Sequence, residues 1–295
     1  MIKLAFVILN FNSSKETLRL IEEIESQSWG SEVGIFVVDN NSCENEREIL
    51  GAEFAKSINP KLKHIFLRQN YGYAVGNNKG IELAKSDGYN TIVISNPDII
   101  FSSQAEFIKE IEKTIHIDNK ITVIAPSIKN NNNMDENPFR KTRFTKKEVI
   151  KIKFFYLTGI YKIYYFIRVY ILFRIGSYLA NLKNEKIEKS RVESEAGYIY
   201  APHGSFMILT QTFLKNLQGF DPNTFLYCEE FILAEKIREQ NLNVYYNPKI
   251  IVIHKQGCSS DTLVGNYLEK VKFTLKHTFD SCRYFAKVIN LLSRK

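Results

Sequence analysis

The sequence has few of the features that mark a membrane-spanning, secreted or disulfide-linked protein. Its four cysteines lie far apart and form no Cys-x-x-Cys pair, which argues against a zinc knuckle or a disulfide framework and favours a reduced, cytoplasmic protein. No stretch approaches the roughly 18 uncharged apolar residues of a membrane span. The apolar start, residues 2–9, is too short for a signal peptide and predicts a first strand.

The motifs of common nucleotide-binding classes are missing as well. The segment NYGYAVGNNKG, residues 70–80, lacks the G-x-G-x-x-G spacing, and there is no Lys-Ser pair of a phosphate loop. The segment still offers backbone N–H groups and a helix N-terminus to an anion. Close helix–strand packing would explain one of its glycines but not the pair Asn77 and Asn78.

The net charge of +8 is concentrated in one part of the chain. Residues 141–191 hold 13 Lys and Arg against 3 acidic residues, and the remainder has 27 basic and 29 acidic residues. A nucleic-acid-binding protein would be basic over a larger share of its surface. The pattern therefore argues against nucleic acid as a partner and predicts a basic insert on a nearly neutral body.

The first 125 residues alternate between short Ile/Val-rich runs and segments of helical periodicity. This alternation predicts an α/β fold in which helices cover both faces of a mostly parallel sheet. In such sheets ligands bind beyond the carboxyl ends of the strands. The expected strands are residues 2–9, 33–38, 62–67, 91–95 and 121–125.

A polar cluster follows each of the first four expected strands. Pro97 cannot donate to a strand ladder, so pairing should stop there and Asp98 should be presented in a nearly fixed direction. Asp39 could accept from a nucleobase or a ribose hydroxyl, or it could cap the following helix. The four clusters are Asn10-Phe11-Asn12, Asp39-Asn40-Asn41, Asn70-Tyr71-Gly72 and Asn96-Pro97-Asp98.

The second half contains two further groups of reactive side chains. Glu229 and Glu230 begin an expected helix at about 228–240, where acids could simply complement the helix dipole. His254 directly follows an expected strand and is either structural or a metal ligand. The remaining expectations are a mobile loop at 126–150, strands at 197–201 and 205–210, a short strand pair near 243–253 and a long helix from about 264.

Taken in order, these segments resemble the family-2 glycosyltransferases with the GT-A fold. Among them, the chain resembles the rhamnosyltransferase-like enzymes of bacterial surface-polysaccharide assembly. The resemblance covers about residues 1–125 and 197–260 and rests on the ordered series rather than on any one motif. The series is VILNFNSS, VVDNNS, NYGYAVGNNKG, SNPDI, GSFMIL, GFDPNTFLYCEE and VIHKQGCSS.

The resemblance implies a division of the chain and a role for each cluster. It implies a donor-binding half at 1–125 and an acceptor half at 197–262. Composition and periodicity add a basic aromatic helical insert at 126–196, a candidate for membrane-surface contact, and a C-terminal amphipathic helix at 263–295. The implied donor-binding residues are Asn10, Phe11, Asn12, Asp39, Asn40, Asn70, Gly72, Asn77, Asn96 and Asp98, and the implied acceptor-side residues are His203, Gly204 and Glu229.

The resemblance also implies a metal site and a catalytic base. Asn96-Pro97-Asp98 stands where the family has Asp-x-Asp, so Asp98, with His254, would hold Mg²⁺ or Mn²⁺ against the pyrophosphate of the donor. Glu230 stands at the family's general base, where an Asp is usual. A further family Asp, two residues later, is Ile232 here, which puts in doubt the contact that this Asp makes.

Two segments are open to more than one interpretation. The aromatic stretch at 150–182 could lie on a membrane surface or form a helical hairpin packed on the catalytic domain. The apolar stripe of the C-terminal helix could face the core, a membrane or a second subunit of a homo-oligomer. Its members are Val264, Leu268, Val271, Leu275, Cys282, Phe285, Ile289 and Leu292.

The functional hypothesis is an inverting glycosyltransferase at the inner face of the cell membrane. It would move a sugar from a nucleotide-sugar donor onto a hydroxyl of a lipid-linked saccharide for O-antigen, capsule or cell-wall polysaccharide. Rhamnose from dTDP-rhamnose is the first choice and a hexose from a UDP-sugar the second. Because the first metal-site Asp is missing, a nucleotide-sugar-binding protein without turnover is the alternative.

Overall fold

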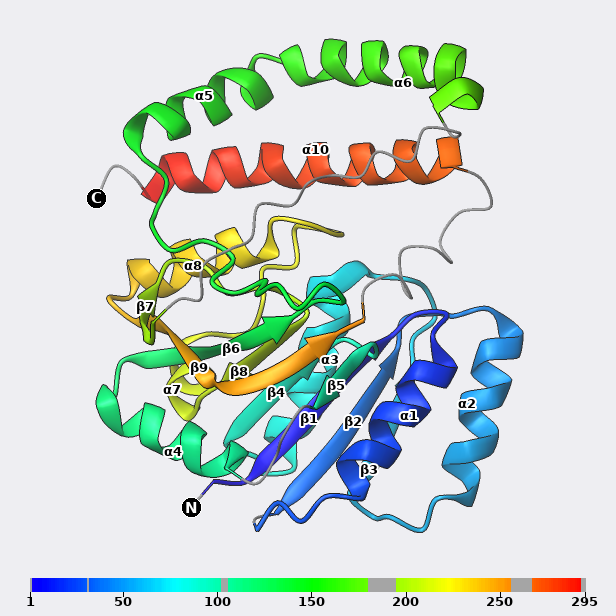
Figure 1. Ribbon diagram of the computed structural model, residues 1–295, viewed down its shortest axis with the longest axis vertical. Helices are drawn as coiled ribbons and strands as arrows, with labels where there is room; N and C mark the ends of the chain where they lie inside the picture. The colour runs from blue at the N-terminus through cyan, green and yellow to red at the C-terminus, as the bar shows by residue number, and fades with distance from the viewer. Residues whose placement is uncertain (1, 31, 102–105, 180–194, 256–266, 293–295) are drawn as a thin grey trace.

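The computed structural model describes residues 2–30, 32–101, 106–179, 195–255 and 267–292 (Figure 1). The strands are β1 (Leu4–Asn10), β2 (Val33–Asp39), β3 (Leu62–Phe66), β4 (Thr91–Ser95), β5 (Ile99–Phe101), β6 (Ile121–Lys129), β7 (Gly197–Ile199), β8 (Phe206–Leu209) and β9 (Asn243–His254). The helices are α1 (Ser14–Glu25), α2 (Glu44–Lys56), α3 (Gly72–Ser86), α4 (Phe107–Ile117), α5 (Lys146–Leu157), α6 (Ile160–Leu179), α7 (Gln211–Asn216), α8 (Glu229–Glu239) and α10 (Tyr267–Leu292).

The strands form one nine-stranded sheet with the order β3-β2-β1-β4-β8-β6-β9-β5, and β7 pairs with β9. The four strands of the first half, β3-β2-β1-β4, are all parallel. The side chains of β1, β2 and β4 are apolar on both faces because helices cover both, whereas the edge strand β3 exposes Lys63 and His64. In β1, for example, residues 4–8 are completely buried. The predicted α/β sheet is confirmed.

The second half of the sheet mixes parallel and antiparallel pairs. β8 lies antiparallel between β4 and β6, and β9 runs parallel to β6. The expected strand pair near 243–253 is instead the single strand β9. β6 also continues to Lys129, into the stretch expected to be a loop. The extension is stable because Asp135 accepts hydrogen bonds from Ser127 Oγ (2.7 Å) and from the Ile128 N–H (3.0 Å).

Helices bury two separate apolar clusters against the sheet. On one face, α1, α2 and α4 contribute Leu20, Leu50 and Ile111 to a core that includes Phe6 of β1. On the other face, α3, α7 and α8 pack against the alternate side chains of β1 and β4. The carboxyl ends of the parallel strands remain at one edge of the sheet, next to the start of α8.

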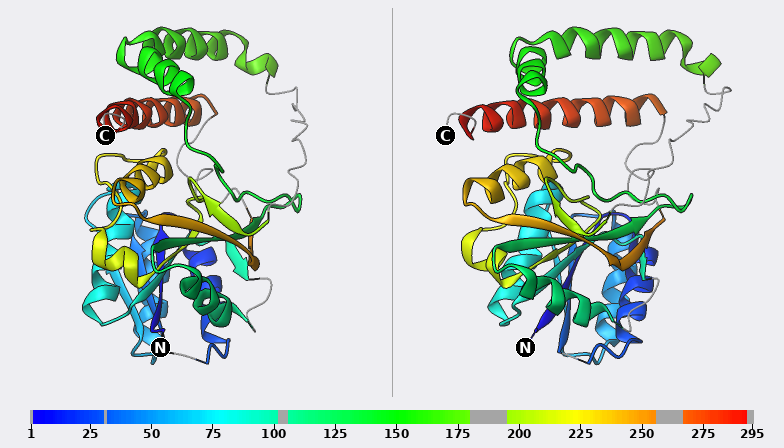
Figure 2. Two further views of the ribbon diagram at one scale, coloured as in Figure 1. Left: turned by 90° about the vertical axis from the view of Figure 1, so that its left-hand side faces the viewer. Right: turned by 60° about the vertical axis from the view of Figure 1, so that its left-hand side comes forward.

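An additional layer of helices lies beyond α8. α5 and α6 pack on α10, and α10 packs on α8, as both views in Figure 2 show. Phe285 and Ile289 of α10 are buried with Val149 of α5 and Ile232 of α8. In the C-terminal apolar stripe, Phe285 and Ile289 are therefore core residues, and Val271, Leu275 and Cys282 are half-buried. Val264 lies outside the described residues, and the side chains of Leu268 and Leu292 are not described. Among the helices that the structure describes, none is both long and apolar enough to cross a membrane.

Candidate active site

The loops after β1 and β2 are locked together by one buried hydrogen-bond network. Asn10 pairs in register with Asp39, and Asn10 Nδ2 donates to Asp39 Oδ2 (2.8 Å) and Ser42 Oγ (3.0 Å). Thr17 Oγ1 donates to Asn10 Oδ1 (2.8 Å). Asn10 and Asp39 are buried, whereas the adjacent Phe11 is partly exposed. The network thus supports a partly exposed loop at the edge of the sheet.

Asp39 does not cap the helix that follows it. The N-cap of α2 is Cys43, whose N–H donates to Asn12 Oδ1 (2.8 Å). Asp39 instead accepts a hydrogen bond inside its own turn and lies 3.5 Å from Arg47 Nε. The helix-cap interpretation was wrong, and a contact from Asp39 to a nucleobase or ribose stays a prediction.

The loop after β3 is tied to the loop after β2 through Asn40. Its Nδ2 donates to Asn70 Oδ1 (2.9 Å) and to the Gly72 carbonyl (3.1 Å), and its Oδ1 accepts from the Tyr71 N–H (2.9 Å). Gly72 has a left-handed φ of +81°, and a Cβ there would collide with the backbone of Phe225. A glycine is therefore required where the donor half meets the loop before α8.

The remaining polar and glycine residues of α3 are largely structural. A Cβ at Gly76 or Gly80 would collide with side chains of β1, so packing explains two glycines rather than the one expected. Asn78 clamps the backbone of Phe220, since it both donates to the carbonyl (2.9 Å) and accepts from the N–H (2.8 Å). Asn77 is completely buried, and its Oδ1 has no hydrogen-bond partner.

Arg19 of α1 holds the turn that presents Asp98. Its guanidinium donates to the carbonyl of Pro97 (3.0 Å) and to that of Ile99, and its other end donates to Glu23 (2.7 Å). The backbone on both sides of Asp98 is therefore fixed without the use of its side chain. Asp98 is buried, and its Oδ1 has no hydrogen-bond partner.

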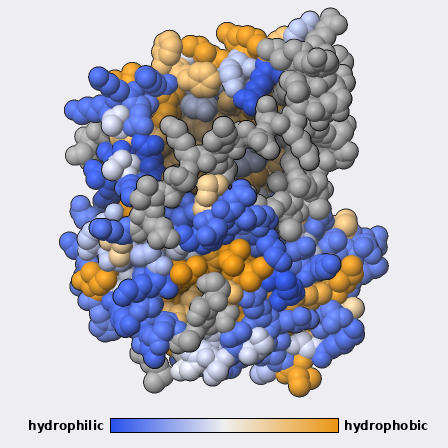
Figure 3. All heavy atoms as spheres, in the orientation of Figure 1, coloured by the Kyte–Doolittle hydropathy of each residue, from blue (hydrophilic) through white to orange (hydrophobic). Residues whose placement is uncertain are grey.

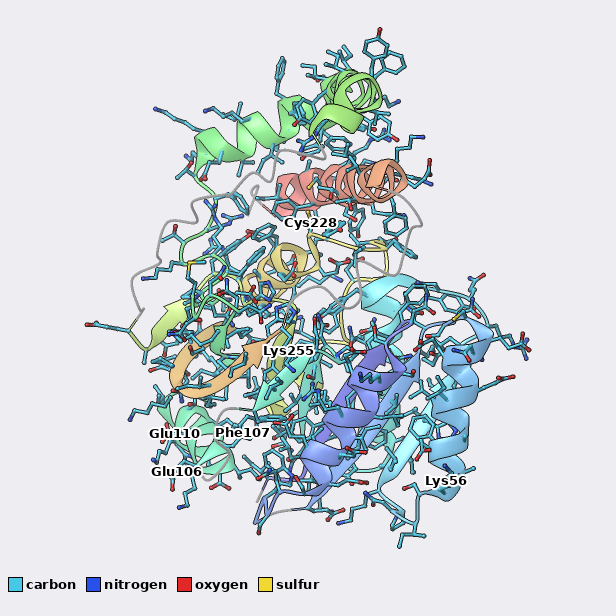
Figure 4. The ribbon with its side chains drawn as sticks, turned by 45° about the vertical axis from the view of Figure 1, so that its right-hand side comes forward. Lys56, Glu106, Phe107, Glu110, Cys228 and Lys255 are labelled. Carbon is cyan, nitrogen blue, oxygen red and sulfur yellow. The ribbon has the colours of Figure 1, made fainter. Side chains whose placement is uncertain are left out.

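His254 lies next to Asp98 because Ile99 pairs with His254 between β5 and β9. His254 Nε2 is 3.3 Å from Asp98 Oδ1, and Nδ1 is 2.8 Å from Glu136 Oε2. Burial alone would lower the pKa of His254, but the two carboxylates raise it to about 9. Lys255, labelled in Figure 4, follows His254, and its N–H donates to the Asp98 carbonyl (3.1 Å).

The Asp98–His254 pair fits a divalent cation. Adjacent ligands of an octahedral ion bound at about 2.1 Å lie about 3 Å apart, similar to the 3.3 Å between Asp98 Oδ1 and His254 Nε2. A cation would also bind the buried Asp98 Oδ1, which has no hydrogen-bond partner and lies beside the His254 imidazole. In the part of the chain that the structure describes, no group of three or more such side chains forms a metal site. Phosphate and water oxygens would therefore complete the shell.

Glu136 orients the imidazole of His254, and we expect Glu136→Gln to weaken Mn²⁺ binding about 10- to 100-fold, as removal of outer partners of metal ligands does. The contact of Nδ1 with the Glu136 carboxylate favours a proton on Nδ1, so that Nε2 is the nitrogen that would lose its proton and bind the cation. Calorimetric titration of Mn²⁺ in the presence of a nucleoside diphosphate measures the effect. Glu82→Gln, on the exposed side of α3, is the matched control. Equal Mn²⁺ affinity in all three proteins would exclude this role.

The segment 203–205 lies between the Asp98 turn and the acidic pair Glu229 and Glu230. The Asn96 N–H donates to the Ser205 carbonyl (2.8 Å), and His203 Nδ1 lies 2.8 Å from Ser205 Oγ. On the other side, a Cβ at Gly204 would lie 2.5 Å from Glu230 Oε1. Any larger residue at position 204 would therefore displace the Glu230 carboxylate.

Glu229 and Glu230 begin α8 and both hold a proton more tightly than usual. Burial, and then the charge of Glu230, raise the pKa of Glu229 to about 8. Burial also raises the pKa of Glu230, although hydrogen bonds from its own backbone N–H and that of Gly204 oppose the rise. Tyr73 OH donates to the carbonyl of the same Gly204 (2.5 Å). Carboxyls with raised pKa values at a site edge are candidates for general bases.

Helix α10 supports the loop that leads to these acids. The Phe225 ring stacks on His277 with centroids 4.4 Å apart, and Ser281 Oγ donates to the Leu226 carbonyl (2.8 Å). Further along, Tyr284 OH donates to Asp221 Oδ2 (3.1 Å), so successive turns of α10 hold successive parts of the loop.

The last two residues before α8 adopt an uncommon backbone conformation. Tyr227 and Cys228 both have left-handed φ angles, 75° and 66°, which non-glycine residues adopt only when surrounding contacts impose them. The contact at this point is Cys228 Sγ, 3.0 Å from Cys282 Sγ of α10. Figure 4 shows Cys228 directly beneath α10. Although the two thiols lie far apart in the sequence, the fold brings them together.

Sequence reasoning missed Arg19, Tyr73 and Glu136. Each acts across a long sequence separation, and neither Arg19 nor Glu136 belongs to one of the motifs. Glu136 lies in the polar stretch interpreted as a mobile loop. Only a weak signal existed for Tyr73, which belongs to the glycine-rich segment but has an aromatic side chain that is typical of a core.

A comparison with known protein families identifies the class of this chain. The chain belongs to glycosyl transferase family 2, whose model matches residues 5–178. It is therefore a glycosyltransferase. A relative in Haloferax volcanii, the low-salt glycan biosynthesis hexosyltransferase Agl10, is 22% identical over 265 residues that cover 90% of this chain and 71% of the relative.

Two solved structures show the same fold at low sequence identity. The mannosyltransferase PcManGT from Pyrobaculum calidifontis, in complex with GDP-Man and Mn²⁺, has a TM-score of 0.55 and 11% identity, covering 98% of this chain and 73% of that one. GalNAc-T7 with UDP, GalNAc and Mn²⁺ has a TM-score of 0.56 and 13% identity, covering 86% of this chain. This chain spans 44% of GalNAc-T7. The neighbours confirm the expected GT-A fold.

Proposed function

We propose that this glycosyltransferase is an inverting, metal-dependent enzyme that moves a hexose or deoxyhexose from a nucleoside diphosphate onto a saccharide hydroxyl. The observation that carries the proposal is the segment 203–205, which lies between the Asp98 turn on one side and Glu230 on the other. An inverting transferase needs this arrangement because the acceptor hydroxyl attacks the anomeric carbon on the side opposite to the one from which the diphosphate leaves.

The side chains divide the chemistry between them. Asp98 and His254 would hold Mg²⁺ or Mn²⁺, which supplies positive charge to the departing diphosphate. Glu230 would accept the proton of the acceptor hydroxyl. At the same time the hydroxyl oxygen would bond to the anomeric carbon of the sugar, and the bond between that carbon and the diphosphate would break. The loops that contain Phe11, Asp39 and Asn70 would bind the nucleotide at the carboxyl edge of the sheet.

We further propose that the acceptor is a lipid-linked saccharide at the inner face of the cell membrane. The name of the Agl10 relative, a hexosyltransferase of glycan biosynthesis, supports a glycan product. Rhamnose from a thymidine diphosphate donor remains the first choice and a hexose from a UDP-sugar the second. The basic insert favours an anionic membrane surface over a neutral one.

A thermal-shift screen of dTDP, UDP and GDP, each with and without Mn²⁺, should identify the donor nucleotide. A ligand that binds the native state stabilises it by about 2.7 kcal/mol at roughly a hundred times its Kd. We expect one nucleotide to raise Tm well above the others, and only when Mn²⁺ is present. If no nucleotide raises Tm with Mn²⁺, or if Mn²⁺ makes no difference, the proposed metal-dependent site is wrong.

A further inference from the structure

Helices α5 and α6 expose an unusual amount of apolar surface. Eight of the fourteen large hydrophobic residues exposed in the described chain lie on these two helices, including Phe166 (72% exposed), Ile150 (64%), Phe154 (62%) and Ile163 (62%). We call the surface formed by Ile150, Phe154, Leu157, Ile163, Phe166 and Ile167 the outer face. Figure 3 shows apolar residues gathered along this end of the molecule.

Among the residues that the structure describes, none covers the outer face, whose six side chains are all exposed. The opposite sides of the two helices hold them in place, since Tyr156 and Tyr161 pack on Phe279 of α10 and Val149 lies in the buried cluster with Phe285. In Figures 1 and 2, α5 and α6 form the outermost layer, with α10 beneath them. A helix exposed to water that carries apolar residues on most of its described surface requires another partner.

The charges around the outer face identify the kind of partner. Lys147, Lys151, Lys162 and Arg168 are exposed on α5 and α6, while Glu148 of α5 is already bonded to Arg140 (2.7 Å). A second copy docked by two-fold symmetry would place this basic surface against itself. An anionic lipid surface would neutralise it, and tyrosine, phenylalanine and basic residues are the composition of interfacial helices.

We propose that the outer face of α5 and α6 docks on the surface of an anionic bilayer, with its apolar side chains inserted at the head-group level. The inference deepens the proposed membrane location and assigns it to particular residues. One layer, α10, separates this face from α8, so Glu230 would stand roughly two helix spacings, about 20 Å, from the lipid surface. That distance places the base over an acceptor sugar that projects from a lipid head group.

Vesicle sedimentation of the full chain tests the proposal. Wild-type protein should sediment with vesicles of phosphatidylglycerol and phosphatidylcholine, and less with pure phosphatidylcholine or at high salt. Phe154→Ser combined with Phe166→Ser should reduce binding to the anionic vesicles at least about tenfold, because two inserted rings are lost. The matched control, Ile58→Ser with Ile117→Ser, removes two exposed apolar residues elsewhere (98% and 55% exposed) and should bind like wild type.

Three outcomes would overturn the proposal: unchanged binding of the Phe154→Ser/Phe166→Ser variant, equal loss in the control, or equal sedimentation with neutral vesicles. A lipid-free dimer in ultracentrifugation that the same double variant dissociates would instead identify the face as a subunit interface. The vesicle assay needs neither donor nor turnover, and Glu230→Gln should bind vesicles like wild type. A failure of the proposed transfer reaction would therefore leave the vesicle result unchanged, and the reverse also holds.

Discussion

Replacing Glu230 with glutamine should lower the rate of sugar transfer by about 10²- to 10⁴-fold, the usual contribution of a general base. Binding of donor and Mn²⁺ should remain, because Asp98 and His254 lie on the other side of segment 203–205. Glutamine has nearly the same shape, so the contact with Gly204 is preserved while the proton acceptor is lost. Single-turnover transfer, measured beside calorimetric donor binding, separates the two effects.

The pKa of Glu230 adds a second readout. Because burial raises this pKa, the unprotonated base should accumulate only above the usual pH range of a Glu carboxyl, and kcat/KM of the wild type should increase as pH rises through the raised pKa. The Glu230→Gln variant should lose this dependence. If Glu230→Gln transfers sugar at the wild-type rate, the reaction does not take place at this pair of acids.

Glu229→Gln is the matched control, with a smaller expected effect on rate and a distinct effect on stability. In the folded protein the pKa of Glu229 is raised to about 8, so the wild type loses stability as pH rises from the unfolded pKa of roughly 4.3 through about 8. Glutamine carries no charge, so the Tm of the variant relative to wild type should increase between acidic and mildly basic pH. If this variant is the inactive one, the base is Glu229.

Asp98→Ala should abolish Mn²⁺-dependent binding of the nucleoside diphosphate while the protein stays folded. The Mn²⁺-dependent affinity should fall by at least the roughly 10- to 100-fold expected for loss of a residue that only orients a metal ligand, since Asp98 would be a direct ligand. The turn should survive because Arg19 holds the carbonyls of Pro97 and Ile99, not the carboxylate. Calorimetry of the nucleotide with and without Mn²⁺ measures the effect.

Asp280→Ala provides the control for Asp98→Ala. Asp280 is an exposed carboxylate on α10, so its removal should change neither nucleotide affinity nor its dependence on Mn²⁺. Circular dichroism would detect unfolding of the Asp98→Ala protein, so that a loss of fold is not mistaken for a loss of metal binding. Unchanged Mn²⁺-dependent affinity in folded Asp98→Ala protein would disprove the metal-ligand role.

The parallel half of the sheet was predictable because its signals are local. Alternating apolar runs and helical periodicity located β1 to β4, and the proline after β4 predicted that Asp98 would be presented at a strand end. The convergence of the polar clusters followed from parallel topology, and the Asn10–Asp39 and Asn40–Asn70 hydrogen bonds agree with it. Family membership confirms the transferase class, whereas the individual site roles stay predictions.

The parts that sequence reasoning missed depend on contacts between distant residues. β6 continues through Ser127 because Asp135 pairs with its polar groups, and no local pattern predicts that capping. Packing was expected to explain only one glycine of residues 70–80, whereas both Gly76 and Gly80 allow α3 to approach β1 closely. Similarly, the contact between Glu136 and His254 could not be predicted, because it depends on where the fold places β9.

The support that α10 gives to the catalytic loop has a consequence for how the enzyme is made. A chain leaves the ribosome from its N-terminus, and domains fold as their segments emerge. The nucleotide-binding edge can therefore assemble while the loop at 221–228 still lacks its contacts with His277, Ser281 and Cys282. The proposed base, Glu230, would reach its position only after α10 has been synthesised, so a nascent chain would complete the proposed nucleotide-binding edge before the proposed base.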